Sequence, residues 1–138
     1  MANYHCAVRT NRFRVIDENQ FMEYMKRVEV DGGEITILKD RDSSGSPIYG
    51  FSANGLILGV SDYSEESVSI DEDMYDNFIA GLQEIVSDDD AIIILEVGFS
   101  NTDDLSSTAT IVTTFDTDYI DLQDVASDRA IELLTDIR

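Results

Sequence analysis

The sequence predicts one α+β domain with an antiparallel or mixed sheet of about five to six strands and three helices. The chain has 138 residues, which suits a single domain over 1–138, and its 43% hydrophobic content is enough for a core. Apolar residues alternate with a period of two in several short segments and recur with the helical period in three others. Turn-rich polar clusters separate these segments.

The N-terminal half predicts a strand, a helix and two further strands. Residues 3–16 alternate polar and apolar side chains, with an irregularity at Asn11 and Arg12. Asp17 is placed to cap the first helix. The apolar stripe of that helix is Phe21, Met22, Met25 and Val28. Residues 33–40 and 47–60 predict two strands joined across the turn-forming sequence "RDSSGSP".

The C-terminal half begins with a second helix, for which Ser69 and Glu72 form a capping box. Its buried face is expected to be Met74, Phe78, Leu82 and Ile85. The sequence "AIIILEVGF" is continuously apolar, which is typical of a strand buried on both faces. The sequences "TATIVTTF" and "YIDLQ" predict one or two more strands, and Asp124 is placed to cap a final helix.

The predicted order is therefore β-α-β-β-α-β, followed by C-terminal strands and a helix. The first six elements match the ferredoxin-like split βαβ pattern. Each helix has one apolar stripe to bury, so we expect the helices to cover mainly one face of the sheet.

The charge of the chain is distributed unevenly along the sequence. The 29 acidic and 9 basic residues give a net charge of −20. Residues 1–41 contain seven of each sign and residues 129–138 contain two of each. The whole excess lies in residues 42–128, which contain twenty acidic residues and no Lys or Arg. Folding does not require this arrangement, because like charges one helical turn apart are destabilising.

We predict that part of this excess forms a partner-binding surface, concentrated in residues 62–104. The helix dipole favours the acids of a first helical turn, but it does not explain those that lie elsewhere. Asp116 and Asp118 are candidates to extend the surface. The residues expected to contact a partner are Asp62, Glu65, Glu66, Glu72, Asp73, Asp76, Glu84, Asp88, Asp89, Asp90, Asp103 and Asp104.

Two simpler explanations of the charge are weaker. Solubility of a small domain needs a net charge of only about 2–8. Adaptation to high salt would favour an acidic surface all round, whereas the first 41 residues are neutral and hold seven bases. A concentrated acidic face is better explained by attraction of a basic partner, since carboxylates one helical turn apart lie about 5–6 Å from each other, as neighbouring phosphates of a nucleic acid do.

The sequence does not indicate an enzyme, a bound cofactor or a metal centre. His5 and Cys6 are each the only residue of their type, and as neighbours in a strand they point to opposite faces. The sequence "DRDSSG" begins like a calcium loop but has Phe51 where a bidentate Glu is needed, so a β-turn is the better interpretation. An enzyme that uses clustered Asp with Mg²⁺ is kept as a third hypothesis.

The sequences "MANYHCAVRTNRFRV" and "YDNFIAGLQEIVSDDDAIIILEVG" resemble a set of small acidic proteins found on mobile elements of Gram-positive bacteria. In size and acidity the chain is also similar to anti-CRISPR and anti-restriction inhibitors of phages, several of which mimic DNA. This resemblance implies a non-enzymatic inhibitor whose partner is a nuclease or Cas effector, blocked at its DNA-binding cleft. It brings no catalytic residues.

The expected partner is thus a basic nucleic-acid-binding protein, while nucleic acid itself would be repelled by the same charges. The alternative is an immunity protein or antitoxin that neutralises a basic toxin. The sequence has no apolar run of membrane-spanning length and its start lacks the apolar stretch of a signal peptide; with a single cysteine, this predicts a cytoplasmic protein that does not bind membranes. The sequence does not predict an oligomeric state.

Overall fold

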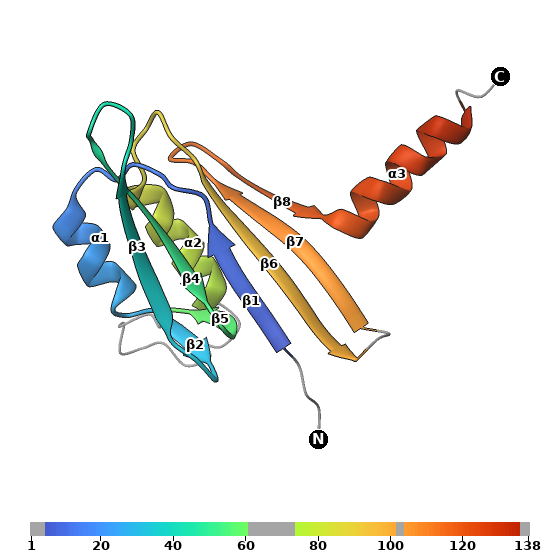
Figure 1. Cartoon of the computed structure of the whole chain (residues 1–138), viewed down its shortest axis with the longest axis horizontal. Helices are drawn as coiled ribbons and strands as arrows, with labels where there is room; N and C mark the ends of the chain where they lie inside the picture. The colour runs from blue at the N-terminus through green and yellow to red at the C-terminus, as the bar shows by residue number, and fades with distance from the viewer. Residues whose placement is uncertain (1–4, 61–73, 102–103, 136–138) are drawn as a thin grey trace.

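The computed structural model describes residues 5–60, 74–101 and 104–135 (Figure 1). It contains three helices and eight strands within these ranges. The elements are β1 (His5–Thr10), α1 (Glu18–Met25), β2 (Glu29–Asp31), β3 (Ile35–Arg41), β4 (Pro47–Ala53), β5 (Leu56–Gly59), α2 (Met74–Ile85), β6 (Ile92–Asn101), β7 (Asp104–Val112), β8 (Thr117–Asp121) and α3 (Leu122–Thr135).

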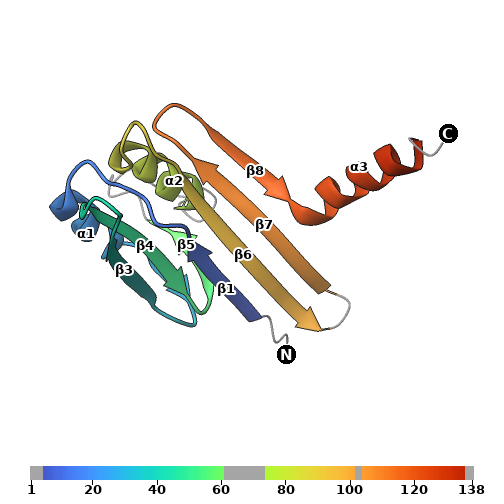
Figure 2. The same cartoon turned by 45° about the horizontal axis from the view of Figure 1, so that its top comes forward.

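The predicted α+β class and the number of strands in the main sheet are confirmed. Six strands form one sheet in the order β3-β4-β1-β6-β7-β8, and each neighbouring pair is antiparallel. The strands β3-β4-β1-β6, with α1 and α2, have the order of the split βαβ pattern. The strands β7 and β8 extend the sheet beyond β6, and α3 follows β8 at that edge (Figures 1 and 2).

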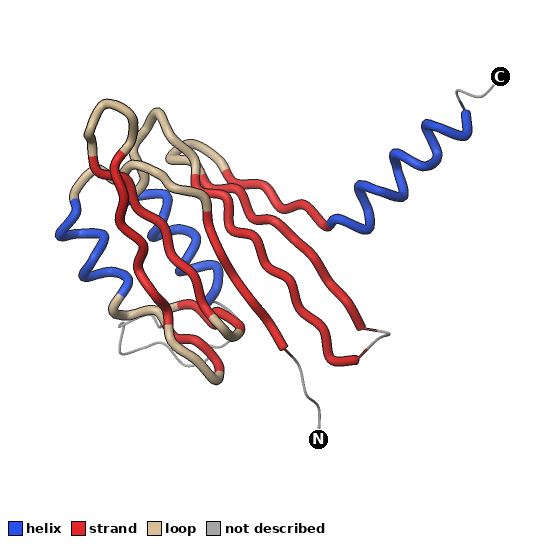
Figure 3. The backbone as a smooth tube through the Cα atoms, viewed as in Figure 1, coloured by secondary structure: helices blue, strands red, loops and turns tan. Residues whose placement is uncertain are grey.

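Two helices lie on one side of this sheet, which we call the inner face (Figures 1 and 2). The buried side chains of α1 are Phe21 and Met25. Those of α2 are the predicted Met74, Phe78, Leu82 and Ile85. The opposite side is called the outer face, and Figure 3 shows that α3 extends away from the sheet instead of covering either face.

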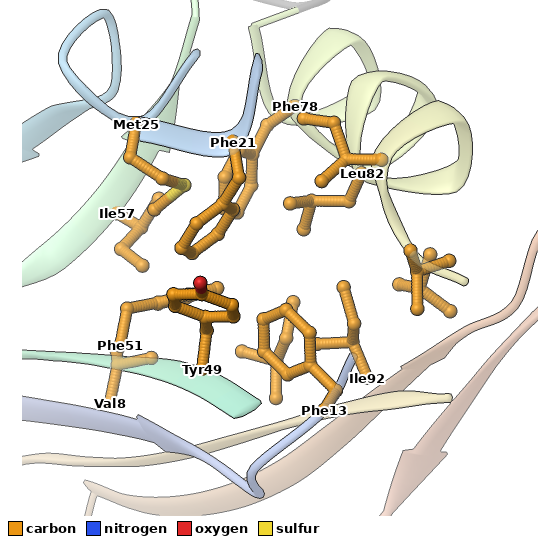
Figure 4. Packing of buried hydrophobic residues seen from close by; sticks show 14 of the residues in the cluster. Val8, Phe13, Phe21, Met25, Tyr49, Phe51, Ile57, Phe78, Leu82 and Ile92 are labelled. Atoms are coloured by element: carbon orange, nitrogen blue, oxygen red, sulfur yellow. The ribbon is translucent and has the colours of Figure 1, made fainter. Parts of the chain in front are cut away.

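Aromatic rings make up the centre of the core between the helices and the inner face (Figure 4). Phe13 contacts Phe21 edge-on with ring centroids 5.8 Å apart, and Phe51 contacts Phe78 at 5.9 Å. Phe21 lies 5.4 Å from Tyr49. Such edge-to-face arrangements add a favourable electrostatic contribution to the burial of apolar surface. The core therefore fixes both helices against the four strands of the split pattern, β3, β4, β1 and β6.

The end of the first predicted strand is irregular, as expected. Beyond Thr10 the chain forms only isolated bridges, in which Phe13 pairs with Tyr49 and Val15 with Val86. The amide of Asn11 joins this segment to β6, because its Nδ2 donates to the Ala91 carbonyl and its Oδ1 accepts from Ile93 N.

Asp17 is the cap of α1, as predicted, and its side chain accepts a hydrogen bond from Asn19 N. The prediction for the last helix was wrong by one turn. The helix begins at Leu122, and the Asp121 carboxylate accepts from Gln123 N at 2.9 Å. Asp121, the last residue of β8, therefore does the capping expected of Asp124.

The predicted strand 47–60 is two strands, β4 and β5. The chain breaks at Asn54 and Gly55, where Gly55 has a φ of +151° that other residues rarely adopt. After this turn β5 leaves the main sheet and pairs with β2 in a separate two-stranded sheet. The predicted capping box at Ser69 and Glu72 lies outside the described residues.

The strand β6 differs from the prediction that both of its faces are buried. Ile92 and Ile94 point to the inner face and are at most 1% exposed. Leu95 and Val97 point to the outer face and are 42% and 46% exposed. One side of an apolar strand is thus left uncovered by the residues that the structure describes. No helix among the described residues is long and apolar enough to cross a membrane.

Candidate acidic binding surface

Two of the predicted contact residues lie on the solvent side of α2. Because Phe78 and Leu82 are fully buried on its inner side, Asp76 and Glu84 are turned outward and exposed. They are eight residues apart, which corresponds to about 12 Å along a helix axis. The residue halfway between them, Ala80, is small and exposed, so the two carboxylates border one stretch of helix surface.

The loop between α2 and β6 continues this surface with Asp88 and Asp89, which are both exposed. The Ser87 hydroxyl donates a hydrogen bond of 2.7 Å to Asp89 Oδ1. This bond is the main cause that lowers the pKa of Asp89, with a smaller contribution from the charge of Arg14. Asp89 therefore stays ionised well below neutral pH and presents a fixed negative charge.

Asp90 has a different environment from its two neighbours. Its Oδ2 accepts a hydrogen bond of 2.8 Å from Arg14 N, and the Arg14 guanidinium lies 3.9 Å away. The same guanidinium contacts Asp42 Oδ2 at 2.6 Å. A base from the neutral N-terminal segment thus reaches the acidic loop and connects it to the β3–β4 hairpin. Asp90 has a structural role in addition to any contact with a partner.

The other predicted acids of the described chain are not neutralised in this way. Five ion pairs form among the described residues, and they leave out Asp76, Glu84, Asp88 and Asp89. Two of the pairs, Lys26 with Glu23 and Arg129 with Glu132, are exposed contacts within one helix or its end. Such pairs contribute little to stability. The four acids are therefore available to an external cation.

The structure also brings β8 next to α2, which the sequence did not predict. A hollow of about 600 Å³ lies between them, and both Asp76 and Asp118 line it. Tyr75 and Tyr119 belong to the same lining. Burial raises the pKa of Tyr75, so its hydroxyl remains protonated. Asp118 is paired with Ile111, so its side chain points to the outer face and away from the acidic surface of α2, while Tyr119 points to the inner face.

Several predicted contact residues lie outside the described residues, namely Asp62, Glu65, Glu66, Glu72, Asp73 and Asp103. Asp104 is the first residue of β7, paired with Asn101, and its side chain is likewise not described. Asp116 lies in the turn before β8, where its Oδ1 accepts a hydrogen bond from Thr117 N.

The residues considered for catalysis, His5 and Cys6, lie against other side chains of the sheet. His5 packs against Phe99 on the outer face, with ring centroids 5.0 Å apart and the ring planes tilted by 33°. Cys6 is on the inner face, where burial and the nearby Glu96 raise its pKa to about 11. In the part of the chain that is described, no three side chains of His, Cys, Asp and Glu are grouped so that they could hold a metal ion.

The "DRDSSG" segment is a β-hairpin turn, as its sequence favoured. Asp42 Oδ1 accepts hydrogen bonds from Ser44 N, Ser44 Oγ and Ser46 N at 2.7–2.9 Å. These bonds, together with Arg14, hold the pKa of Asp42 well below its usual range. Both oxygens of this carboxylate are engaged within the protein, so the turn is explained without a cation.

Comparison of the chain with protein-family models, with curated proteins and with solved structures gave no match.

Proposed function

We propose that this protein is a non-enzymatic inhibitor that binds the nucleic-acid cleft of a basic nuclease or Cas effector through its acidic surface. The single observation that carries the proposal is the set of exposed carboxylates on α2 and the following loop, Asp76, Glu84, Asp88 and Asp89, which form no ion pair among the described residues. The similarity in size and acidity to anti-CRISPR and anti-restriction inhibitors supports the same partner class.

The physical basis is the exchange of one polyanion for another. A cleft lined by Lys and Arg holds nucleic acid largely through its phosphates, and binding releases counterions. A rigid row of carboxylates offers the same charge without the flexibility of an acidic tail, because the aromatic core fixes α2. Association would be accelerated by the field of the chain, and affinity would fall steeply as salt rises.

The direct test is a pull-down from a lysate of the host, followed by elution with a salt gradient. We expect a DNA-binding enzyme that elutes as salt increases, and inhibition of its DNA binding by the purified chain. Recovery of a salt-insensitive partner, or none, would contradict the proposal. Recovery of a cationic toxin that binds no nucleic acid would instead favour an immunity protein.

A matched pair of variants locates the binding surface. Asp88→Asn with Asp89→Asn removes two charges from the proposed surface, and Asp31→Asn with Glu34→Gln removes two charges from the β2–β3 turn. Asp90 is left unchanged because it holds Arg14. We expect the first variant to weaken binding by about tenfold or more, since contacts between close charges are often worth more than 1 kcal/mol, and the second to have little effect. Equal loss in both would show that only net charge matters.

A further inference from the structure

The outer face of the sheet carries an apolar surface that no other part of the described chain covers. Cross-strand pairing places Leu95 beside Ala109, Val97 beside Ser107 and Phe99 beside Leu105. The side chains of β6 on this face, from Ile93 to Phe99, are 36–46% exposed, and Leu105 is 71% exposed. Isolated exposed apolar residues are ordinary, but a contiguous patch on two adjacent strands marks an interaction site.

The sequence of β6 indicates independently that this face is covered in the working protein. A strand that is apolar at successive positions is typical of a sheet with both faces buried. In a strand with one solvent-exposed face, apolar residues alternate with polar ones. The stretch Ile92–Val97 has only one polar residue, Glu96, and it points to the inner face.

The helix α3 also has apolar side chains that the described chain leaves exposed. None of its residues is buried, although Leu122, Val125, Ile131 and Leu133 are 49–63% exposed apolar side chains. Leu122, Ala126, Ala130 and Leu133 follow the helical period and form one stripe. A helix of 14 residues is marginal in water without a surface to pack on. The helix α3 extends away from its own sheet beyond the end of β8 (Figures 1 and 2).

We propose that α3 packs on the outer sheet face of a second copy of this chain, and that the exchange is reciprocal in a twofold dimer. A twofold axis makes the two contacts identical, so each copy covers one face and has its own face covered. The exposed fractions of these side chains correspond to roughly 400 Å² of apolar surface on the sheet face and a similar area on the α3 stripe. Each contact buries one sheet face and one stripe, so the two contacts of the dimer would bury on the order of 1,600 Å², the size of a standard stable interface.

The similar apolar areas of the outer face and of the α3 stripe support a second copy as the occupant. Asp124 and Asp128 lie on the side of α3 opposite the stripe, so both carboxylates would stay in solvent in the dimer. The acidic surface on α2 lies over the inner face, so it stays open on both copies.

The test measures the mass of the full chain by sedimentation equilibrium at 0.1 M and 1 M NaCl. We expect twice the 15.4 kDa of one chain, with tighter association at high salt, because screening reduces the repulsion between two chains of charge −20. A monomer at both salt concentrations would overturn the proposal. So would a monomer whose α3 amides are protected from hydrogen exchange, since α3 would then fold onto its own chain.

Paired variants identify the contact. Val97→Lys alters the sheet face and Leu133→Glu alters the helix stripe, while Gln20→Lys, on the exposed surface of α1, and Ser127→Glu introduce the same charges outside both surfaces. We expect the first two to weaken the dimer by about tenfold or more, as at the centre of an interface, and the controls to leave it within about twofold. If Val97→Lys unfolds the chain, Leu105→Lys replaces it, because Leu105 is the more exposed.

Mixing the two weakened variants distinguishes a reciprocal exchange from other dimers. In a mixed pair, the intact helix of Val97→Lys meets the intact sheet face of Leu133→Glu, and the altered surfaces bring opposite charges together. We expect native mass spectrometry of an equimolar mixture to detect the mixed dimer well above the twofold excess over either homodimer that random pairing gives. A dimer that is insensitive to Leu133→Glu, or a mixture without mixed dimers, would refute the reciprocal arrangement. None of these outcomes depends on the inhibitory function.

Discussion

Replacing Gly81 with Ala tests the contact that fixes α1 against α2. A Cβ at position 81 would overlap the hydroxyl and ring of Tyr24. The Tyr24 hydroxyl cannot easily yield, because it donates to the carbonyls of Asn77 and Phe78 at 3.1 and 3.0 Å. Its ring is also stacked parallel to that of Phe78. Gly81 is therefore required by close packing and not by a special backbone angle.

The magnitude follows from three opposing effects. Overpacking costs about 1–3 kcal/mol, and displacement of the Tyr24 hydroxyl loses a hydrogen bond worth about 1 kcal/mol. Replacement of Gly by Ala inside a helix gains about 1 kcal/mol. We expect Gly81→Ala to lower the free energy of unfolding by about 1–3 kcal/mol in the wild-type chain. In a Tyr24→Leu background the overlap is absent, and the same change should stabilise by up to about 1 kcal/mol.

The assay is urea unfolding of the four chains of this double-mutant cycle, with linear extrapolation. The reversal of sign between the two backgrounds is the result that supports the packing argument. Ala80→Gly is the matched control, since Ala80 is on the exposed side of the same helix and should lose about 1 kcal/mol in either background. An equal effect of Gly81→Ala in both backgrounds would refute the reasoning.

Three further predictions concern the core, the Cys6 thiol and acid stability. Phe78→Ala should lower the free energy of unfolding by about 3–5 kcal/mol, because it leaves a cavity among the rings; a loss under 1 kcal/mol in urea unfolding would be inconsistent with its full burial. The pKa of Cys6 is raised to about 11 from 9.0, so alkylation of its thiol at pH 8 should be about a hundredfold slower than that of a free thiol. Glu96→Gln should accelerate the alkylation. An alkylation rate that levels off below pH 9 would contradict the raised pKa. Folding lowers the pKa of Asp42 below its ordinary value of 3.8, so the unfolded chain takes up protons first and stability should fall as the pH drops below about 4. Asp42→Asn should flatten that part of the thermal stability profile, and an unchanged profile would exclude Asp42 as a cause.

Local patterns predicted most of the fold because each element encodes its own period. The spacing of Met74, Phe78, Leu82 and Ile85 gave the buried face of α2, and Asp17 gave the cap of α1. The break between β4 and β5 was missed because Gly55 lies in an otherwise apolar run, and its positive φ is a property of the tertiary structure. A single Gly in a strand pattern is a signal for such a break.

The candidate site could be predicted less fully, because it depends on which strands become neighbours. Tyr119 lines the same hollow as Asp76 only because β7 and β8 pair and bring the sheet edge beside α2, and the same pairing turns Asp118 to the outer face. The contacts of Arg14 with Asp42 and Asp90 could likewise not be predicted from the sequence, because these two acids are 48 positions apart. Net charge by segment identified an acidic region but could not separate Asp90, which is held within the fold, from Asp88.

The two proposed surfaces respond to salt in opposite directions, which allows them to be separated in one titration. Docking of the acidic α2 surface on a basic cleft is driven by charge and weakens as salt rises. Association of α3 with the outer face is driven by apolar burial and is opposed by the charge of −20 on each chain, so it strengthens over the same range.

If docking and dimerisation both occur, low salt favours a single chain bound to its partner, whereas a dimer presents two acidic surfaces at once. A bivalent inhibitor would then retain affinity at salt concentrations that release the Leu133→Glu variant, because the second contact is made at high effective concentration. Identical salt dependence of inhibition for the wild-type and Leu133→Glu chains would exclude this coupling while leaving each surface to its own test.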